Sequence, residues 1–259
     1  MPAFASGFAS LLAMAGLAVP APRIASLNLC TDELLVAVAP AARVISLSHL
    51  SHSPAEASFW REARRYPAND GSIAGIARYR PTLILTMGGA GRDSARLAQA
   101  VGARLVTLPY PRNVADVAAS ARQVGRLAGD AAAGERVART LDALVRTAPR
   151  ARPALLLSGA GEVTTPGTLN GDWLRLAGYA APAGTPARVE LEHLLLRPPS
   201  LLIRSDYRAG QVSANARWQR HPAWARLRAT PTLMTDGRRW TCGGPSLVPE
   251  IIRLRRARP

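Results

Sequence analysis

The sequence predicts an α/β protein built from two Rossmann-like lobes with parallel sheets, joined by one long helix. Short apolar runs alternate with helical patterns over residues 23–108, and the alternation returns over residues 154–256. This alternation is typical of parallel sheets covered by helices. Two consecutive helical patterns separate the two runs. A single doubly wound sheet is the alternative that the pattern leaves open.

The first run predicts the N-terminal lobe, which we assign to residues 22–130. Apolar stretches bounded by turn residues predict its strands, and apolar residues at helical spacing predict its helices. Thr31 or Asp32 is suited to cap the first helix through a side-chain oxygen, and Pro40 ends it. We expect strands at 23–27, 43–48, 82–87 and 104–108, and helices at 31–39 and 92–101.

The middle of the chain is helical over residues 114–127 and 135–145. Each segment carries one apolar face, and Gly129-Asp130 separates the two. We assign residues 131–149 to the helix that links the lobes.

The C-terminal lobe is assigned to residues 150–259, where strands and helices resume. The same signals predict its elements. We expect strands at 154–158, 201–204 and 232–235, and helices at 171–177, 191–196, 218–227 and 245–256.

The N-terminus has the features of a secretory signal peptide, which we place at residues 1–21. Residues 4–19 are small, apolar and uncharged, and they are too few to span a bilayer. Ala18 and Ala21 suit signal-peptidase cleavage, although the region before the apolar stretch lacks Lys and Arg. An exported, periplasmic protein follows from this assignment. A disordered N-terminus is the alternative.

The composition indicates a folded chain without a nucleic-acid signature. Hydrophobic residues make up 48 % of it, and the formal net charge is +16. Every basic side chain except histidine is Arg, and these are scattered, with one dense cluster at residues 253–258. Because nucleic acid is bound by a clustered basic face, we expect no nucleic-acid partner.

The two cysteines, Cys30 and Cys242, lack the spacing of a zinc or redox motif. Both fall on loops that follow predicted strands, one in each lobe. A disulfide between them would tie the lobes together, and an oxidising compartment would permit it. Free thiols that contact a ligand are the alternative.

Ligands of such folds lie at the carboxyl ends of the strands. Backbone N–H groups at the start of the first helix can hold an anion, glycines allow a ligand close to the backbone, and Tyr or Trp offers a flat apolar face. His49 and His52 could share a metal, but no third ligand is evident, so we predict no metal site. The predicted ligand-binding residues are Asn28, Leu29, Cys30, Thr31, His49, Met87, Gly88, Tyr110, Gly159, Tyr207, Trp240 and Cys242.

Several segments resemble the binding proteins of ABC importers, in particular the cobalamin and ferric-siderophore group. These segments follow one another in the family's order and cover nearly all of the chain after residue 22. They read RIASLNLCTDELL at 23–35, RVISLS at 43–48, YRPTLIL at 79–85, LLRPPSLLI at 195–203 and WTCGGP at 240–245.

The resemblance implies a monomeric, cofactor-free protein that binds a corrinoid or ferric siderophore between its lobes and delivers it to a permease in the inner membrane. It assigns transporter docking to a Glu in each lobe. The second-lobe Glu falls on Glu192, whereas Ala74 and Gly75 stand where the first-lobe Glu is expected, with Asp70 the nearest acid. A haem or metal-ion binder of the same fold is an alternative.

An enzyme is the alternative of another class, with Asn28, Cys30, His49 and Asp206 as a Cys-His site. The sequence contains no Gly-x-Ser-x-Gly elbow and no phosphate loop. We therefore predict that the protein is not an enzyme.

Overall fold

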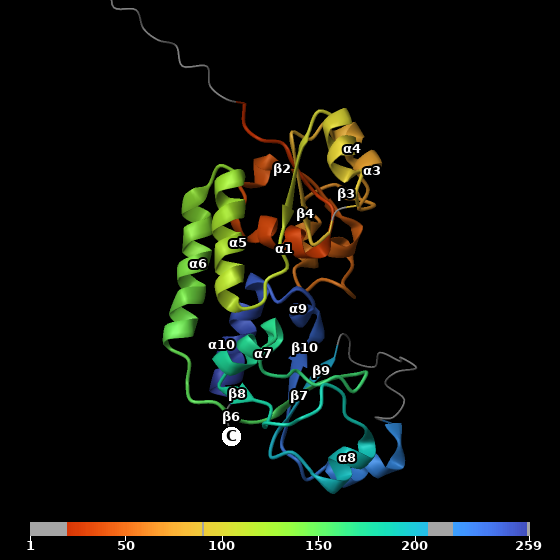
Figure 1. The fold of residues 1–259 in the computed structure, drawn as a ribbon, viewed down its shortest axis with the longest axis vertical. Helices are drawn as coiled ribbons and strands as arrows, with labels where there is room; N and C mark the ends of the chain where they lie inside the picture. The colour runs from red at the N-terminus through yellow and green to blue at the C-terminus, as the bar shows by residue number, and fades with distance from the viewer. Residues whose placement is uncertain (1–19, 90, 207–219, 258–259) are drawn as a thin grey trace, which may run out of the picture.

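The computed structural model describes residues 20–89, 91–206 and 220–257, which form two lobes stacked along the long axis of the molecule (Figure 1). The N-terminal lobe is built on a parallel five-stranded sheet of order β3-β2-β1-β4-β5. Its strands are β1 Ile24–Ser26, β2 Val44–Ser48, β3 Ala68–Asn69, β4 Leu83–Met87 and β5 Arg104–Leu108. The central strand β1 is fully buried, as its apolar sequence predicts.

The helices of this lobe are short except for the first. They are α1 Leu29–Val38, α2 Trp60–Ala63, α3 Ile73–Ile76 and α4 Ser94–Ala100, with 3₁₀ turns at Ala41–Arg43, His49–His52 and Ala77–Tyr79. Helix α1 begins at Leu29, two residues earlier than predicted, because Asn28 caps it by accepting a hydrogen bond from the Thr31 N–H.

Two antiparallel helices, α5 Val114–Leu127 and α6 Ala131–Arg146, run along both lobes (Figure 1). Asn113 and Asp130 cap them, and Gly129 adopts the left-handed conformation that the tight turn between them requires. The helices approach closely where Gly125 faces Gly134.

The helix pair belongs to the cores of both lobes. Ala121 and Val124 of α5 pack with the N-terminal lobe, whereas Val117 of α5 and Leu141 of α6 pack with the C-terminal lobe. An apolar face shared in this way resists changes in the distance between the lobes, because any separation would expose it to water.

The C-terminal lobe carries a parallel three-stranded sheet of order β10-β9-β7 and a separate two-stranded sheet, β6-β8. The strands are β6 Arg152–Pro153, β7 Leu155–Ser158, β8 Tyr179–Ala180, β9 Leu202–Asp206 and β10 Thr232–Asp236. The helices are α7 Leu169–Leu176, α8 Leu191–Leu196, α9 Gly237–Cys242 and α10 Val248–Arg256, with 3₁₀ turns at Pro222–Leu227 and Pro245–Leu247.

The predicted fold class is confirmed: two separate parallel sheets are joined through a helix pair. The helix expected at 245–256 is divided into a 3₁₀ turn and α10, because Pro245 and Pro249 each lack a backbone N–H. The helix expected at 218–227 is 3₁₀ over Pro222–Leu227, and its first residues lie outside the described part of the chain. The predicted signal peptide also falls outside it, except for its last two residues.

Candidate ligand-binding cleft between the lobes

The carboxyl ends of the parallel strands in the N-terminal lobe bring four predicted residues to one edge. Asn28 follows β1, His49 follows β2, Met87 ends β4 and Tyr110 follows β5. His49 and Tyr110 are exposed, whereas Met87 is buried.

Asn28 and Thr31 are bonded within the protein. The Asn28 amide donates to Thr86 Oγ1 at 3.0 Å and to the Met87 carbonyl at 3.1 Å, joining the β1 turn to the end of β4. Thr31 is fully buried, and its hydroxyl lies 2.6 Å from that of Ser26. These side chains fix the shape of the edge.

Gly88 and Tyr110 together form a flat surface on this edge. Gly88 has φ of 79°, and a Cβ built there would lie 2.2 Å from Tyr110 Cε2. The Tyr110 ring therefore rests directly on the glycine, while its side chain stays 68 % exposed. An exposed aromatic in this position can pack against a ligand.

His52 is bonded to backbone carbonyls of the N-terminal lobe. His52 lies 2.9 Å from the Tyr66 carbonyl through Nε2 and 3.2 Å from the Ser48 carbonyl through Nδ1. Within the described ranges, no group of three or more His, Cys, Asp or Glu side chains is placed to hold a metal ion.

The disulfide between Cys30 and Cys242 resolves the alternatives for the two thiols. It joins the first turn of α1 to the end of α9 across 212 residues of sequence, with the Cα atoms 5.2 Å apart. Both sulfurs are bonded, so neither cysteine is available in this form as a nucleophile or as a free thiol at the cleft.

Two adjacent acids of α1 are buried beside the disulfide. Asp32 accepts hydrogen bonds from the Ser48 N–H and hydroxyl, and burial raises its pKa to about 6. Glu33 accepts a 2.7 Å hydrogen bond from the Ser246 N–H of the other lobe, and burial raises its pKa as well. A Cβ at Gly244 would lie 2.5 Å from the Glu33 carboxylate, so the glycine provides the space that this acid occupies.

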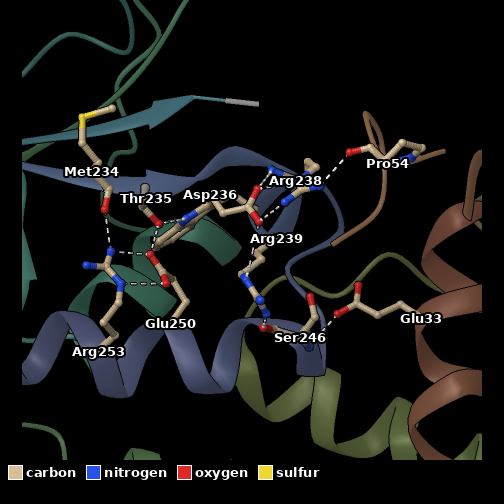
Figure 2. A network of polar contacts seen from close by, with 11 residues as sticks. Glu33, Pro54, Met234, Thr235, Asp236, Arg238, Arg239, Ser246, Glu250 and Arg253 are labelled. Carbon is tan, nitrogen blue, oxygen red and sulfur yellow. Dashed lines mark hydrogen bonds and ion pairs between the residues drawn. The ribbon is translucent and has the colours of Figure 1, made fainter. Parts of the chain in front are cut away.

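Figure 2 shows the polar network that continues from this contact into the C-terminal lobe. Arg238 binds both oxygens of Asp236 and donates to the Pro54 carbonyl at 2.6 Å, which is a second bond between the lobes. Arg239 donates to the Ser246 carbonyl. Disulfide, buried acid and arginine together form an interlobe clamp, a name we keep for Cys30–Cys242, Glu33–Ser246 and Arg238–Pro54.

A pocket of about 450 Å³ lies at the carboxyl edge of the C-terminal sheet. Ser158 of β7 and Ser205 of β9 line it, and so does Gly237, which directly follows β10, so the pocket lies where the three parallel strands end. Trp240, only 5 % exposed, forms part of its wall and donates through Nε1 to Thr235 Oγ1 at 2.9 Å. Thr241 also lines the pocket and precedes Cys242, so the disulfide places the pocket next to the edge of the N-terminal lobe.

The remaining predicted residues fall in different places. Gly159 directly follows β7 beside the pocket, and Tyr207 lies outside the described residues. Glu192 is exposed in the first turn of α8, at the end of the C-terminal lobe remote from the N-terminal lobe (Figure 1). Sequence reasoning missed Thr164, Ser205 and Thr241 in the pocket wall, because single hydroxyl residues carry no motif.

Two α/β lobes joined by a helical bridge, with a pocket at the carboxyl edge of one sheet beside the other lobe, form the architecture of a solute-binding protein. Residues 24–232 match the profile of a family described as periplasmic binding protein. The chain belongs to this family, whose members are solute-binding proteins rather than enzymes. A comparison with curated protein sequences finds no match.

Solved structures of similar fold support the same architecture. The periplasmic haem-binding protein BhuT in complex with two haems has a TM-score of 0.68 at 20 % identity, covering 91 % of this chain and 97 % of that chain. A periplasmic haem-binding protein from Pseudomonas aeruginosa has a TM-score of 0.65 at 19 % identity, covering 91 % of this chain and 92 % of that chain. The periplasmic vitamin B12-binding protein BtuF of Vibrio cholerae has a TM-score of 0.64 at 15 % identity, covering 92 % of this chain and 96 % of that chain.

Proposed function

We propose that this protein is the periplasmic solute-binding component of an ABC importer for a corrinoid or a ferric siderophore. The observation that carries the proposal is the pocket at the carboxyl edge of the C-terminal sheet, held next to the N-terminal lobe by the disulfide. The proteins of similar fold bind haem or vitamin B12, which are large planar metal chelates. Haem or a metal ion is the alternative ligand within the same fold.

The ligand contacts that we propose lie on both sides of the cleft. Tyr110 and Gly88 offer a flat face on the N-terminal side, with His49 at the same edge. Trp240 offers an aromatic wall on the opposite side, near Gly159. A planar ligand between two aromatic side chains buries a large apolar area while its polar groups face the hydroxyls of the pocket.

Delivery requires a membrane partner, and we propose docking of Glu192 to an arginine of the permease. Glu192 is exposed, as such a role requires. In the N-terminal lobe Ala74 is exposed where an acid is expected, and the exposed Asp70 is the nearest substitute. A carboxylate that pairs with arginine across an interface chiefly provides specificity and a faster association rate.

Export to the periplasm through the signal peptide at residues 1–21 belongs to the same proposal. An interlobe disulfide is expected in an oxidising compartment. Within the described part of the chain, no helix is both long and apolar enough to cross a membrane. We also propose that the exported protein acts as a monomer with lobes divided at residues 22–130 and 150–259 around a linking segment at 131–149.

Binding to the exported protein tests the function. We expect cobalamin, cobinamide, haem or a ferric siderophore to raise the melting temperature, since a ligand at 100 times its Kd stabilises the folded state by about 2.7 kcal/mol. Tyr110→Ala is expected to weaken binding at least about tenfold without lowering the melting temperature of the free protein, because the side chain is exposed. Leu97→Ala, another exposed apolar truncation, serves as the control. A protein that is stabilised by none of these chelates does not have the proposed function.

A further inference from the structure

The pocket in the C-terminal lobe contrasts with the rest of this basic chain. The sequence carries 33 basic against 17 acidic residues, yet no described arginine lines the pocket. Glu162 is its one charged lining residue among those that the structure describes. Its polar surface comes from hydroxyl and amide side chains, namely Ser158, Thr164, Thr165, Thr168, Asn170, Ser205 and Thr241.

Arginines adjoin the lining residues in sequence but point elsewhere. Arg238 follows Gly237, and its guanidinium is held by Asp236 and the Pro54 carbonyl. Arg239 precedes Trp240 and donates to the Ser246 carbonyl. Figure 2 shows both side chains within the interlobe network.

The third adjoining arginine also has its own contact. Arg204 precedes Ser205 in β9, and its guanidinium carbon lies 5.8 Å from the centre of the Trp224 ring. The strand alternation that turns Ser205 toward the pocket turns Arg204 to the opposite face of the sheet.

A neighbouring pocket of about 540 Å³ has arginines in its wall. It contains Arg112 and Arg175, and each is paired with an acid. Arg175 binds Asp172 at 2.8 Å, and Arg112 lies 3.7 Å from Asp116. Each guanidinium of this wall therefore has a carboxylate within ion-pair distance.

The opposite side of the cleft adds no arginine or lysine at the proposed contacts. Met87, Gly88 and Tyr110 are uncharged, and Asn28 uses its amide within the protein. An anion transferred from water into such a site would lose solvation without gaining a counter-charge from the lining residues that the structure describes, and Glu162 would repel it. Amide and carbonyl groups, by contrast, find donors and acceptors in the surrounding hydroxyls.

We infer that the cleft selects uncharged metal chelates that present amide or hydroxamate groups, and discriminates against chelates with free carboxylates or anionic catecholates. This inference rests on the proposed function and narrows its ligand class. It favours corrinoids with intact amide side chains and neutral ferric trihydroxamates over haem and ferric tris-catecholates.

Matched ligand pairs test the inference by titration of the exported protein at constant ionic strength. Cyanocobalamin is compared with its derivative in which peripheral amides are hydrolysed to carboxylates, and a neutral ferric trihydroxamate with a trianionic ferric tris-catecholate. In the pair that binds, we expect the neutral member to bind at least about tenfold more tightly. Equal or tighter binding of the anionic member overturns the inference and leaves the proposed function intact. Binding of haem alone overturns the inference and replaces the proposed ligand with the haem alternative. No binding of any chelate overturns both.

Two variants check that the pocket itself sets this preference. Thr165→Arg adds a guanidinium to the wall and is expected to strengthen binding of the anionic member at least about tenfold. Thr140→Arg adds the same charge on the exposed surface of α6 and is expected to leave the preference unchanged. Glu162→Gln is expected to favour the anion in the same direction, with Glu190→Gln, an exposed acid outside this pocket, as its control. An unchanged preference in both Thr165→Arg and Glu162→Gln, with melting temperatures near that of the wild type, contradicts the inference.

Discussion

The two lobes are joined at two places that differ in their chemistry. The helix pair α5 and α6 contributes apolar side chains to both cores, and its closest approach is made by Gly125 and Gly134. The interlobe clamp consists of a disulfide, a buried carboxylate and an arginine bound to a carbonyl. The first junction depends on packing, whereas the second contains a reducible bond and an acid whose pKa is raised by burial. We therefore expect reductant and pH to act on the cleft without disturbing the helix pair.

Loss of the disulfide is expected to give the largest effect on the clamp. Reduction, or Cys242→Ser, removes a link that spans 212 residues, and the loss of a native disulfide typically costs about 2–5 kcal/mol of unfolding free energy. Urea unfolding with and without reductant measures this. The double variant Cys30→Ser/Cys242→Ser is the control, since reductant has nothing left to cleave in it. An unchanged urea midpoint in reductant would show that the helix pair alone holds the lobes.

The buried acids of α1 are expected to make stability depend on pH. Burial raises the pKa of Asp32 from its ordinary value of 3.8 to about 6, so folding binds a proton between these values. The stabilisation by this proton is complete below about pH 4 and lost as pH rises through 6, by up to about 3 kcal/mol. Asp32→Asn should remove this decline, measured as the difference from the wild type in urea unfolding at several pH values.

Glu33 gives the interlobe counterpart of that measurement. Its pKa is also raised by burial, so Glu33→Gln should flatten the same limb of the pH profile. Asp32 bonds within its lobe, whereas Glu33 bonds across the lobes. We therefore expect the pH dependence of ligand affinity to differ from that of the wild type in Glu33→Gln but not in Asp32→Asn. If the affinities of Glu33→Gln and the wild type change with pH in the same way, the clamp does not affect the cleft.

Gly134→Ala tests the helix pair. A Cβ at Gly134 would lie 2.5 Å from the Ala121 carbonyl oxygen, so the helices must separate. Overpacking costs about 1–3 kcal/mol against a gain in helix propensity of about 1 kcal/mol, which leaves a net loss of up to about 2 kcal/mol in thermal unfolding. Thr140→Ala on the exposed side of α6 should change little. If the loss of stability in Gly134→Ala depends on pH, the helix pair does not differ from the clamp in its response to pH.

Arg238→Ala is expected to give the smallest effect. It removes the 2.6 Å bond to the Pro54 carbonyl, and a single hydrogen bond contributes about 0.5–1.5 kcal/mol. It also removes the bonds to Asp236, which keeps Arg239 as an ion-pair partner at 3.8 Å. Thermal unfolding measures the loss, and Arg226→Ala, an exposed arginine of the same lobe, is the matched control. Equal melting temperatures for the two variants would show that Arg238 does not contribute to the stability of the clamp.

The fold was largely predictable because its long elements follow simple spacing. Val114, Val117, Val124 and Leu141 recur at helical intervals, and they are the residues that the helix pair buries. Strand β3 was missed because Ala68–Asn69 is only two residues long, and α9 was missed because its six residues contain no apolar repeat. Such elements are held by tertiary contacts rather than by local preference.

The site was less predictable, because its geometry comes from segments distant in sequence. Predicted strand ends place Met87 and Tyr110 at the carboxyl edge of the N-terminal sheet, and Trp240 lies in the pocket wall of the other lobe. No local pattern pairs Cys30 with Cys242, and the sequence left that pairing open. Likewise, nothing near Glu33 in the chain indicates that Gly244 and Ser246 surround its carboxylate.

The disulfide also makes most of the chain a covalent ring. Cys30 lies at the start of α1 and Cys242 follows β10, so of the strands in the described part of the chain the ring contains all but β1. A protease that cuts once anywhere between them leaves a single molecule, whose halves remain attached and able to re-form their contacts. The bond can form only after both sheets have been synthesised. An oxidised chain is therefore one in which segments of both lobes have come into contact.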